Sequence, residues 1–201
     1  MLDNWLVITI GAILVNNFVL SKFLGICPFL GVSKKIETAL GMSGAVLFVM
    51  TLASLVTSTI YTLLLSRSFT LLGVENINLG FLKILIFIVV IASLVQLVEL
   101  VLQRFFPALN KALGIYLPLI TTNCAVMGVA ELNVKGGHTI LESTIYGFCS
   151  ALGFALALIL FSSLREKLDL ADVPPAFEGT AIALVTAGIL AMAFMGFSGL
   201  V

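Results

Sequence analysis

Charged residues are scarce in this sequence. Only 10% of the 201 residues are Asp, Glu, Lys or Arg, whereas 61% are hydrophobic. A soluble domain is typically about half apolar and about a quarter charged, so a water-soluble core cannot hide this much apolar surface. Basic and acidic residues also balance at ten each, with no basic stripe of the kind that nucleic-acid binding needs. The chain is therefore predicted to have the lipid bilayer as its solvent.

Sequence motifs for cofactor binding, secretion and disulfide scaffolds are also missing. No dinucleotide-binding glycine fingerprint is present, so we expect this chain to bind neither flavin nor NAD. The first apolar run lacks a basic leader and a small-residue cleavage site, and we expect it to be retained as a membrane span. Three cysteines are too few for a disulfide scaffold, and their odd number leaves one over.

Apolar stretches are abundant, and each is long enough to cross a bilayer. A spanning helix needs roughly 20 mostly apolar residues. Six stretches qualify: 4–22, 41–65, 80–102, 113–131, 139–163 and 180–200. The charged residues gather between these stretches, and the sequence indicates no soluble domain. The sequence therefore predicts an all-α integral membrane protein, with residues 1–201 as a single transmembrane domain.

Basic residues are distributed unevenly between the connecting loops. Positive charge favours the cytoplasmic side. The first, third and fifth loops, called the odd loops here, hold six basic residues: Lys34, Lys35, Arg104, Lys111, Arg165 and Lys167. The opposite side holds only three: Arg67, Lys83 and Lys135. This count predicts that the odd loops are cytoplasmic and that both termini lie on the outer face.

A short motif occurs twice. The segments Cys27-Pro-Phe-Leu-Gly31-Val32 and Cys124-Ala-Val-Met-Gly128-Val129 share the pattern C-x-x-x-G-V at an offset of 97 residues. The halves are then about 1–102 and 103–201, with three predicted spans each. An odd number of spans per half reverses the second half in the membrane. We therefore predict an inverted-topology repeat.

Both copies of the motif lie in interrupted apolar segments. The run from 5 to 32 has 28 residues, which as a helix is about 42 Å long and exceeds the roughly 30 Å of hydrocarbon. Break points are offered by Gly25, Pro28 and Gly31 in this run, and by Pro118 and Gly128 around Cys124. Interrupted first and fourth helices at corresponding positions indicate a buried site.

The paired cysteines, Cys27 and Cys124, allow several interpretations. A thiolate is a soft ligand for zinc, cuprous copper or an iron–sulfur cluster, and two matched thiolates suit half of a four-thiolate site. Alternatively, they pack as small apolar side chains or form a disulfide, although membrane depth is not an oxidising compartment. Cys149 has no counterpart in the other half, and we expect it only to pack.

The segments around these cysteines resemble the Rnf family of membrane subunits, in particular its A-type members. The close relative is the E-type member of the sodium-pumping NADH:quinone reductase. The similarity covers nearly the whole chain. It is carried by residues 16–20 and 22–35 around Cys27, residues 117–129 around Cys124, Asp172-Val-Pro-Pro175, and Phe194-Met-Gly-Phe-Ser-Gly-Leu200.

This resemblance implies a function. Rnf complexes transfer electrons between ferredoxin and NAD and couple this to Na⁺ or H⁺ transport across the bacterial inner membrane. The A-type subunit and a homologous E-type subunit of opposite topology are thought to share one [2Fe-2S] cluster, to which this chain would contribute Cys27 and Cys124. The B, C, D and G subunits carry the flavins and other clusters. Two alternatives are a secondary transporter, which inverted repeats also fit, and a structural subunit with inert cysteines.

A few polar residues in or near the spans are further candidates. Glu99 either belongs to an ion path or reaches the interface, since ionisable residues in spans are suspect by default. Asn16 and Asn17 are expected mainly to hydrogen-bond between helices. Residues 121–123 are candidates for donating hydrogen bonds to cluster sulfurs. His138, in a short loop, is expected to be solvated.

Overall fold

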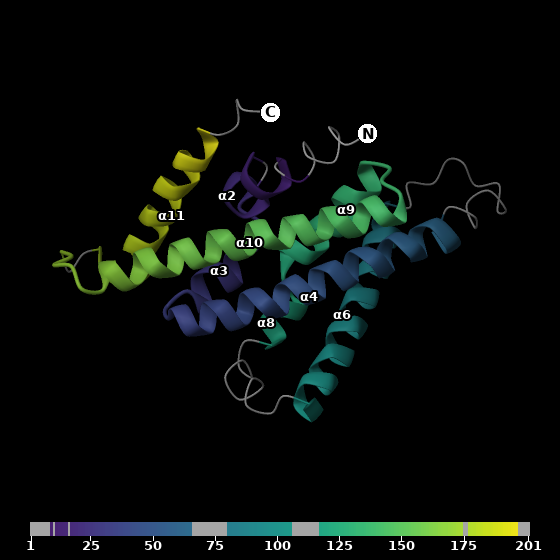
Figure 1. Ribbon diagram of the computed structural model, residues 1–201, viewed down its shortest axis with the longest axis horizontal. Coiled ribbons are helices and arrows are strands. Elements are labelled where there is room, and N and C mark those ends of the chain that lie inside the picture. The colour runs from purple at the N-terminus through teal and green to yellow at the C-terminus, as the bar shows by residue number, and fades with distance from the viewer. Residues whose placement is uncertain are drawn as a thin grey trace.

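The computed structural model of the protein is entirely helical over the residues that it describes (Figure 1). These are residues 9, 11–15, 17–65, 80–105, 117–174 and 177–196. The predicted all-α class is confirmed for this part of the chain. Its elements, with η marking π-helices, are η1 (Gly11–Val15), α2 (Phe18–Lys22), α3 (Ile26–Val32), α4 (Ile36–Ile60), η2 (Tyr61–Leu65), α6 (Gly80–Phe105), α8 (Leu117–Thr121), α9 (Cys124–Lys135), α10 (Ile140–Leu168) and α11 (Thr180–Met195).

Three described helices are long and apolar enough to cross a membrane. They are Ile36–Leu63, Ile84–Val101 and Ile140–Leu168. The segments Gly11–Lys22 and Ile26–Val32 meet at 89° and make a fourth span if they are counted as one bent unit. The predicted spans 113–131 and 180–200 appear as shorter helices, and parts of both lie outside the described residues. The described chain is thus a multi-pass membrane protein with three or four of the six predicted spans.

Helices α4 and α10 form the centre of the fold and lie side by side (Figure 1). Both helices carry large apolar side chains that are at most 3% exposed: Met42, Val46, Val49 and Met50 of α4, and Phe154, Leu158 and Phe161 of α10. The ring of Phe154 stacks on Phe18 of α2, and that of Phe161 stacks on Phe29 of α3. Gly147 lies directly against Ser54, with no room for a Cβ. A small residue at this crossing lets two helices approach closely, which is how helices associate when lipid removes the hydrophobic drive between them.

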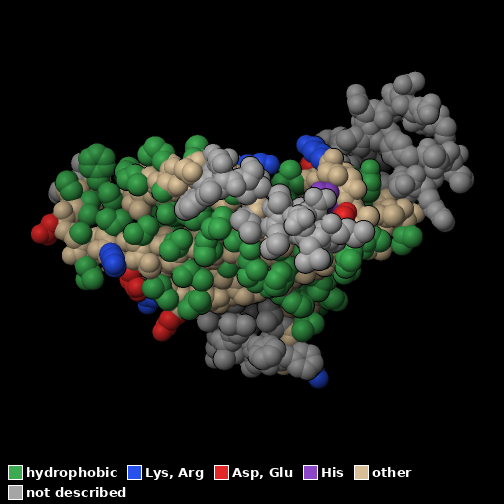
Figure 2. All heavy atoms as spheres, turned by 45° about the horizontal axis from the view of Figure 1, so that its top comes forward, with side chains coloured by type: hydrophobic (Ala, Val, Ile, Leu, Met, Phe, Trp, Pro, Cys, Tyr) green, Lys and Arg blue, Asp and Glu red, His purple; other side chains and the backbone are tan. Residues whose placement is uncertain are grey.

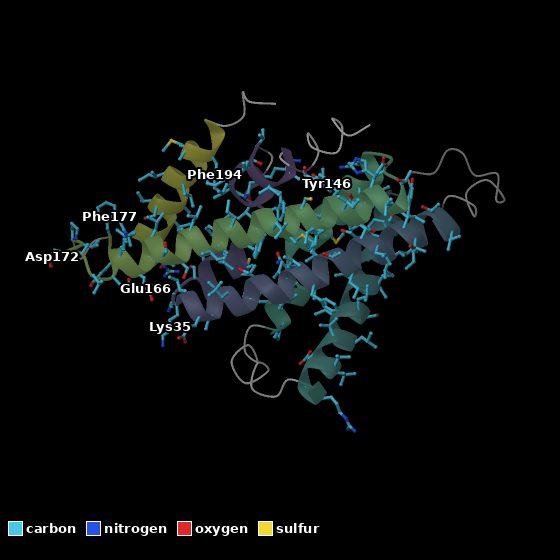
Figure 3. The ribbon with its side chains drawn as sticks, viewed as in Figure 1. Lys35, Tyr146, Glu166, Asp172, Phe177 and Phe194 are labelled. Atoms are coloured by element: carbon cyan, nitrogen blue, oxygen red, sulfur yellow. The ribbon has the colours of Figure 1, made fainter. Side chains whose placement is uncertain are left out.

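The C-terminal end of α10 is tied to the junction of α3 and α4. The guanidinium of Arg165 donates hydrogen bonds to Leu30 O at 2.8 Å and to Ser33 Oγ at 2.9 Å. The last carbonyls of a helix have no partner within the helix and favour a cation. Figure 3 shows Lys35, Glu166 and Asp172 near this same end of the molecule. The first and fifth loops therefore share one side, as the charge count requires.

Replacing Arg165 by methionine is expected to destabilise the protein by about 2 kcal/mol, because hydrogen bonds to charged groups contribute about 1.5–3 kcal/mol. Methionine keeps an apolar stem against Phe161, over whose ring the guanidinium lies at 5.9 Å. Thermal unfolding of the detergent-solubilised complex measures the change. Lys167→Met is the control, since it removes an equal charge from an exposed position of the same helical end. Equal melting temperatures for the two variants would contradict this role of Arg165.

Helix α6 presents most of its surface outward. Phe87, Ile91 and Val95 form a buried stripe at four-residue spacing, whereas Val89, Leu97 and other large apolar side chains are exposed. Figure 2 shows hydrophobic side chains over most of the described face in view, with the few charged ones at its margins. Apolar surface this extensive marks contact with lipid or with other membrane subunits.

Candidate functional site

The first helix break lies between α2 and α3 and depends on two residues in the left-handed backbone conformation. Phe23 has φ 51° and Gly25 has φ 83°, a region that only glycine enters without steric cost. The side chain of Asn17 begins α2 by accepting a hydrogen bond from Val19 N at 3.2 Å, as preferred N-cap residues do. The predicted interruption of the first segment is confirmed, with Gly25 at the break.

Asn17 also holds this break against the central helix. Its Nδ2 donates a hydrogen bond to Gly153 O of α10 at 2.8 Å, and Gly153 lies close to the backbone of Ala12 and Ile13. Glycine at this position keeps the carbonyl of α10 within reach of the asparagine. The predicted role of Asn17 in hydrogen bonding between helices is confirmed, while Asn16 lies outside the described residues.

The second break lies between α8 and α9 at residues 122–123. Asn123 caps α9, because its Oδ1 accepts a hydrogen bond from Ala125 N at 3.0 Å. Thr122 Oγ1 donates to Pro118 O at 3.1 Å, so in this structure its hydroxyl is used within α8. Asn123 Nδ2 is buried and has no hydrogen-bond partner among the described residues. The fourth predicted segment is therefore interrupted too.

Four of the five predicted break points are wrong. Pro28 and Gly31 lie inside α3, Pro118 lies inside α8, and Gly128 lies inside α9. Pro28 occupies the first turn of α3, where its missing N–H has no intrahelical partner to lose. The glycines serve packing instead of breaking their helices.

The two breaks contact each other directly. The backbone N–H of Gly25 donates a hydrogen bond to Cys124 Sγ at 2.9 Å. A Cβ at Gly25 would lie 3.0 Å from Ala125 Cβ and 3.2 Å from Asn123 Oδ1. Residues 99 positions apart in the sequence thus meet at one point. Gly25, two residues before the motif of the first half, contributes the donor, and the motif of the second half contributes the sulfur.

Corresponding residues of the two motifs face the other half of the chain. Gly31 lies against Leu119, and Gly128 lies against Leu24, so each glycine faces a leucine of the other half. The following valines are both fully buried, with 1% exposure for Val32 and 0% for Val129. This reciprocity places the two cysteine-bearing helix starts at corresponding positions around one contact.

Both predicted ligand cysteines are exposed free thiols in the isolated chain. Cys27 is the second residue of α3, and Cys124 is the first residue of α9. Since Cys27 follows Gly25 by two residues, standard backbone dimensions keep the two sulfurs within about 15 Å. Within the described part of the chain, no three His, Cys, Asp or Glu side chains gather as a metal site. Cys149 is buried in α10 at 5% exposure, in agreement with its predicted packing role.

Two other polar candidates have defined surroundings. The prediction that His138 is solvated is wrong, because its ring is half-buried and lies edge-on to Tyr146, with ring centroids 5.5 Å apart. The position of His138 directly before Thr139, the N-cap of α10, was the available signal, since the residue before an N-cap often packs on the helix that follows. Gln103 Nε2 donates a hydrogen bond to Glu99 Oε1 at 3.3 Å. A role of Glu99 in ion transport stays a prediction.

Comparison with known proteins identifies the family. The family described as "Rnf-Nqr subunit, membrane protein" matches residues 5–201. Three similar proteins, from Sodalis glossinidius, Shigella boydii and Escherichia coli, are named as the A component of an ion-translocating oxidoreductase complex, and each is 54% identical over 200 residues. The alignments cover 100% of this chain and 99% of each relative. The chain therefore belongs to the Rnf-Nqr family of membrane subunits.

Proposed function

We propose that this chain is the A-type membrane subunit of an ion-translocating ferredoxin:NAD oxidoreductase. In this proposal, Cys27 and Cys124 supply half of the ligands of a [2Fe-2S] cluster that a homologous E-type subunit completes. The observation that carries the proposal is the hydrogen bond from Gly25 N–H to Cys124 Sγ at 2.9 Å. It joins the two cysteine motifs at a single place while both thiols stay exposed.

The available donors fit half of such a cluster. Iron–sulfur clusters usually take four cysteine thiolates, and the described residues offer two exposed ones near the meeting of the breaks. Exposure in the isolated chain leaves both sulfurs accessible to a partner subunit. When bound, the cluster would supply a one-electron carrier within the membrane.

The surrounding groups suit a negatively charged sulfur. A hydrogen bond from a backbone N–H to an ionised acceptor is stronger than one between neutral groups, and the Gly25 N–H already points at Cys124 Sγ. Cys124 is also the first residue of the 12-residue helix α9, and the N-terminus of a helix carries a partial positive charge. Asn123 Nδ2, in the preceding residue, is buried and has no partner among the described residues, so it is free to donate to the bound cluster. These groups hold the ligand sulfur and would raise the potential of the bound centre.

The remaining features of the proposal concern the assembly. We infer six spans in two inverted halves, 1–102 and 103–201, in the bacterial inner membrane with both termini outside. The order of elements supports this inference, because each half has a short helix, a break, a second short helix and then a long helix. These are α2, α3 and α4 in the first half, and α8, α9 and α10 in the second. The proposed partners are the homologous E-type subunit and the B, C, D and G subunits, and the transported ion is Na⁺ or H⁺.

Metal analysis of the purified complex tests the proposal. Cys27→Ser and Cys124→Ser are each expected to remove two irons and two acid-labile sulfides per complex, together with one electron paramagnetic resonance signal. Cys149→Ser is the matched control, because it changes the buried cysteine of α10 and leaves both motifs intact. An unchanged iron content in both motif variants would favour the transporter or the inert-cysteine alternative.

A further inference from the structure

A cavity with both apolar and polar lining residues lies at the opposite end of the fold from Arg165. Its volume is 580 Å³, and it is bounded by the end of α4 with η2, the end of α9 and the start of α10. The polar residues that line it include Ser58, Thr62, Asn133, His138, Thr139 and Ser143. Under the topology proposed above, this end faces the outside of the membrane.

Three buried polar atoms around this cavity have no hydrogen-bond partner within the described chain. They are Asn133 Oδ1, Ser143 Oγ and His138 Nδ1. Asn133 and Ser143 are only 2% and 1% exposed. Asn133 Nδ2 donates to Ser143 O at 3.3 Å, which assigns the other atom of the amide, Oδ1, as an acceptor. Buried polar atoms are rarely left unpaired, and ordered water is a common partner, so these atoms call for a bound water or ion.

The local electrostatics favour a positive ligand. Helix α9 ends at Lys135, and its negative dipole end adjoins the cavity. The opposing positive end of α10 is offset by Glu142, whose carboxylate accepts a hydrogen bond from Thr139 N at 2.9 Å. No Lys or Arg appears among the described lining residues. Lys135 is instead paired with Glu131 at 3.3 Å, and its side chain is 68% exposed.

The ligand atoms point to a monovalent cation. Hard cations take oxygen ligands, and protein sites for divalent ones rely on carboxylates. The described lining has amide and hydroxyl oxygens but no carboxylate. One water occupies about 30 Å³, so a cavity of 580 Å³ holds an ion together with much of its hydration shell. We propose that this cavity binds a partly hydrated monovalent cation through Asn133 Oδ1 and Ser143 Oγ, with His138 positioned to contact its water.

The site is connected to the cysteine centre through one helix. Cys124 begins α9 and Asn133 lies near its end, so nine residues at 1.5 Å each separate them by about 14 Å along the axis. This link to redox chemistry rests on the proposed function, whereas cation binding itself does not. A cation at one end of α9 and a charged sulfur at the other would act on the same helix dipole.

Equilibrium binding of ²²Na⁺ to the purified complex, with choline chloride keeping the ionic strength constant, tests the site. Ser143→Ala removes a hydroxyl that has no described partner and is expected to weaken sodium binding about tenfold, the effect of losing roughly 1.4 kcal/mol of a charge-assisted contact. Ser162→Ala is the matched control, since Ser162 Oγ is likewise buried and unpartnered on α10 but does not line the cavity. It is expected to bind as the unmodified complex does.

A second variant distinguishes cation binding from simple hydration by the direction in which it changes the sodium affinity. Asn133→Asp places a carboxylate among the ligands and is expected to tighten sodium binding. Equal sodium affinities for Ser143→Ala and Ser162→Ala, or no saturable binding of either Na⁺ or K⁺ to the unmodified complex, would overturn the proposal. Iron content is measured in parallel. Sodium binding that survives in Cys124→Ser supports this site whatever becomes of the cysteine proposal.

Discussion

Under the proposed function, replacing Cys124 by serine is expected to lower ferredoxin-driven NAD reduction by the assembled complex by about a hundredfold or more, because even groups outside the ligand set of a metal site change its activity by about 10–100-fold. A serine hydroxyl stays protonated near neutral pH and is a harder, weaker ligand for iron than a thiolate. Cys27→Ser is expected to lose activity to the same extent, since the two positions are equivalent in the proposed repeat. Steady-state assays of the purified complex measure both.

The control for this prediction is Cys149→Ser, which changes a third cysteine of the same chain. Cys149 is 5% exposed within α10 and, unlike Cys27 and Cys124, is not exposed to a partner. The variant is expected to keep most of the activity. Native gel electrophoresis verifies that all three variants assemble, so that a loss of activity is not a loss of the complex. Near-normal NAD reduction by assembled Cys124→Ser complex would refute the ligand role.

Replacing Gly25 by alanine is expected to destabilise the protein by about 2–5 kcal/mol. A left-handed conformation costs a residue with a Cβ roughly 1–2 kcal/mol, and Gly25 has φ 83°. Overpacking adds about 1–3 kcal/mol, because the new Cβ would lie 3.0 Å from Ala125 Cβ and 3.3 Å from Phe154. The backbone shift that relieves these close contacts would also lengthen the hydrogen bond from residue 25 N–H to Cys124 Sγ. Thermal unfolding of the solubilised complex and the position of the iron–sulfur resonance measure both effects.

Two other glycines separate backbone strain from packing. Gly137 has φ 63° but open space around its Cβ position, so Gly137→Ala is expected to cost only the strain, about 1–2 kcal/mol. Gly44 lies within α4 and also has open space. Gly44→Ala is expected to stabilise the helix by about 0.5–1 kcal/mol. If Gly25→Ala is no more destabilising than Gly137→Ala, the proposed contact between the two breaks is wrong.

Much of the candidate site was predictable from the sequence. The repeated C-x-x-x-G-V pattern singled out Cys27 and Cys124, and the length of the first apolar run required a break, which lies at Gly25. The resemblance to the Rnf family agrees with the family match over residues 5–201. The break and the family are confirmed, because hydrophobic length and glycine conformation act locally and can be recognised from neighbouring residues. The ligand role of Cys27 and Cys124 stays a prediction.

Other features depended on partners far along the chain. Arg165 was counted only as a loop charge, yet it binds Leu30 and Ser33, more than 130 positions away. His138 was expected in solvent, yet it packs on Tyr146. Glycine and proline are ambiguous in sequence, because the same residue either ends a helix or admits a neighbour. Gly128 belongs to the second kind, since Leu24 of the other half fills the space beside it.

The sequence by itself determined the solvent of this protein, its helical class, its paired cysteines and its family. Lipid leaves helices as the simplest way to pair every backbone N–H and C=O, and a composition this apolar imposes that condition throughout. Only the tertiary structure decided that the two breaks meet, that Gly25 donates to Cys124 Sγ, and that Asn133 and Ser143 line one cavity. These contacts arise from the packing of helices distant in sequence, and packing depends on the shapes of both surfaces, which no local pattern contains.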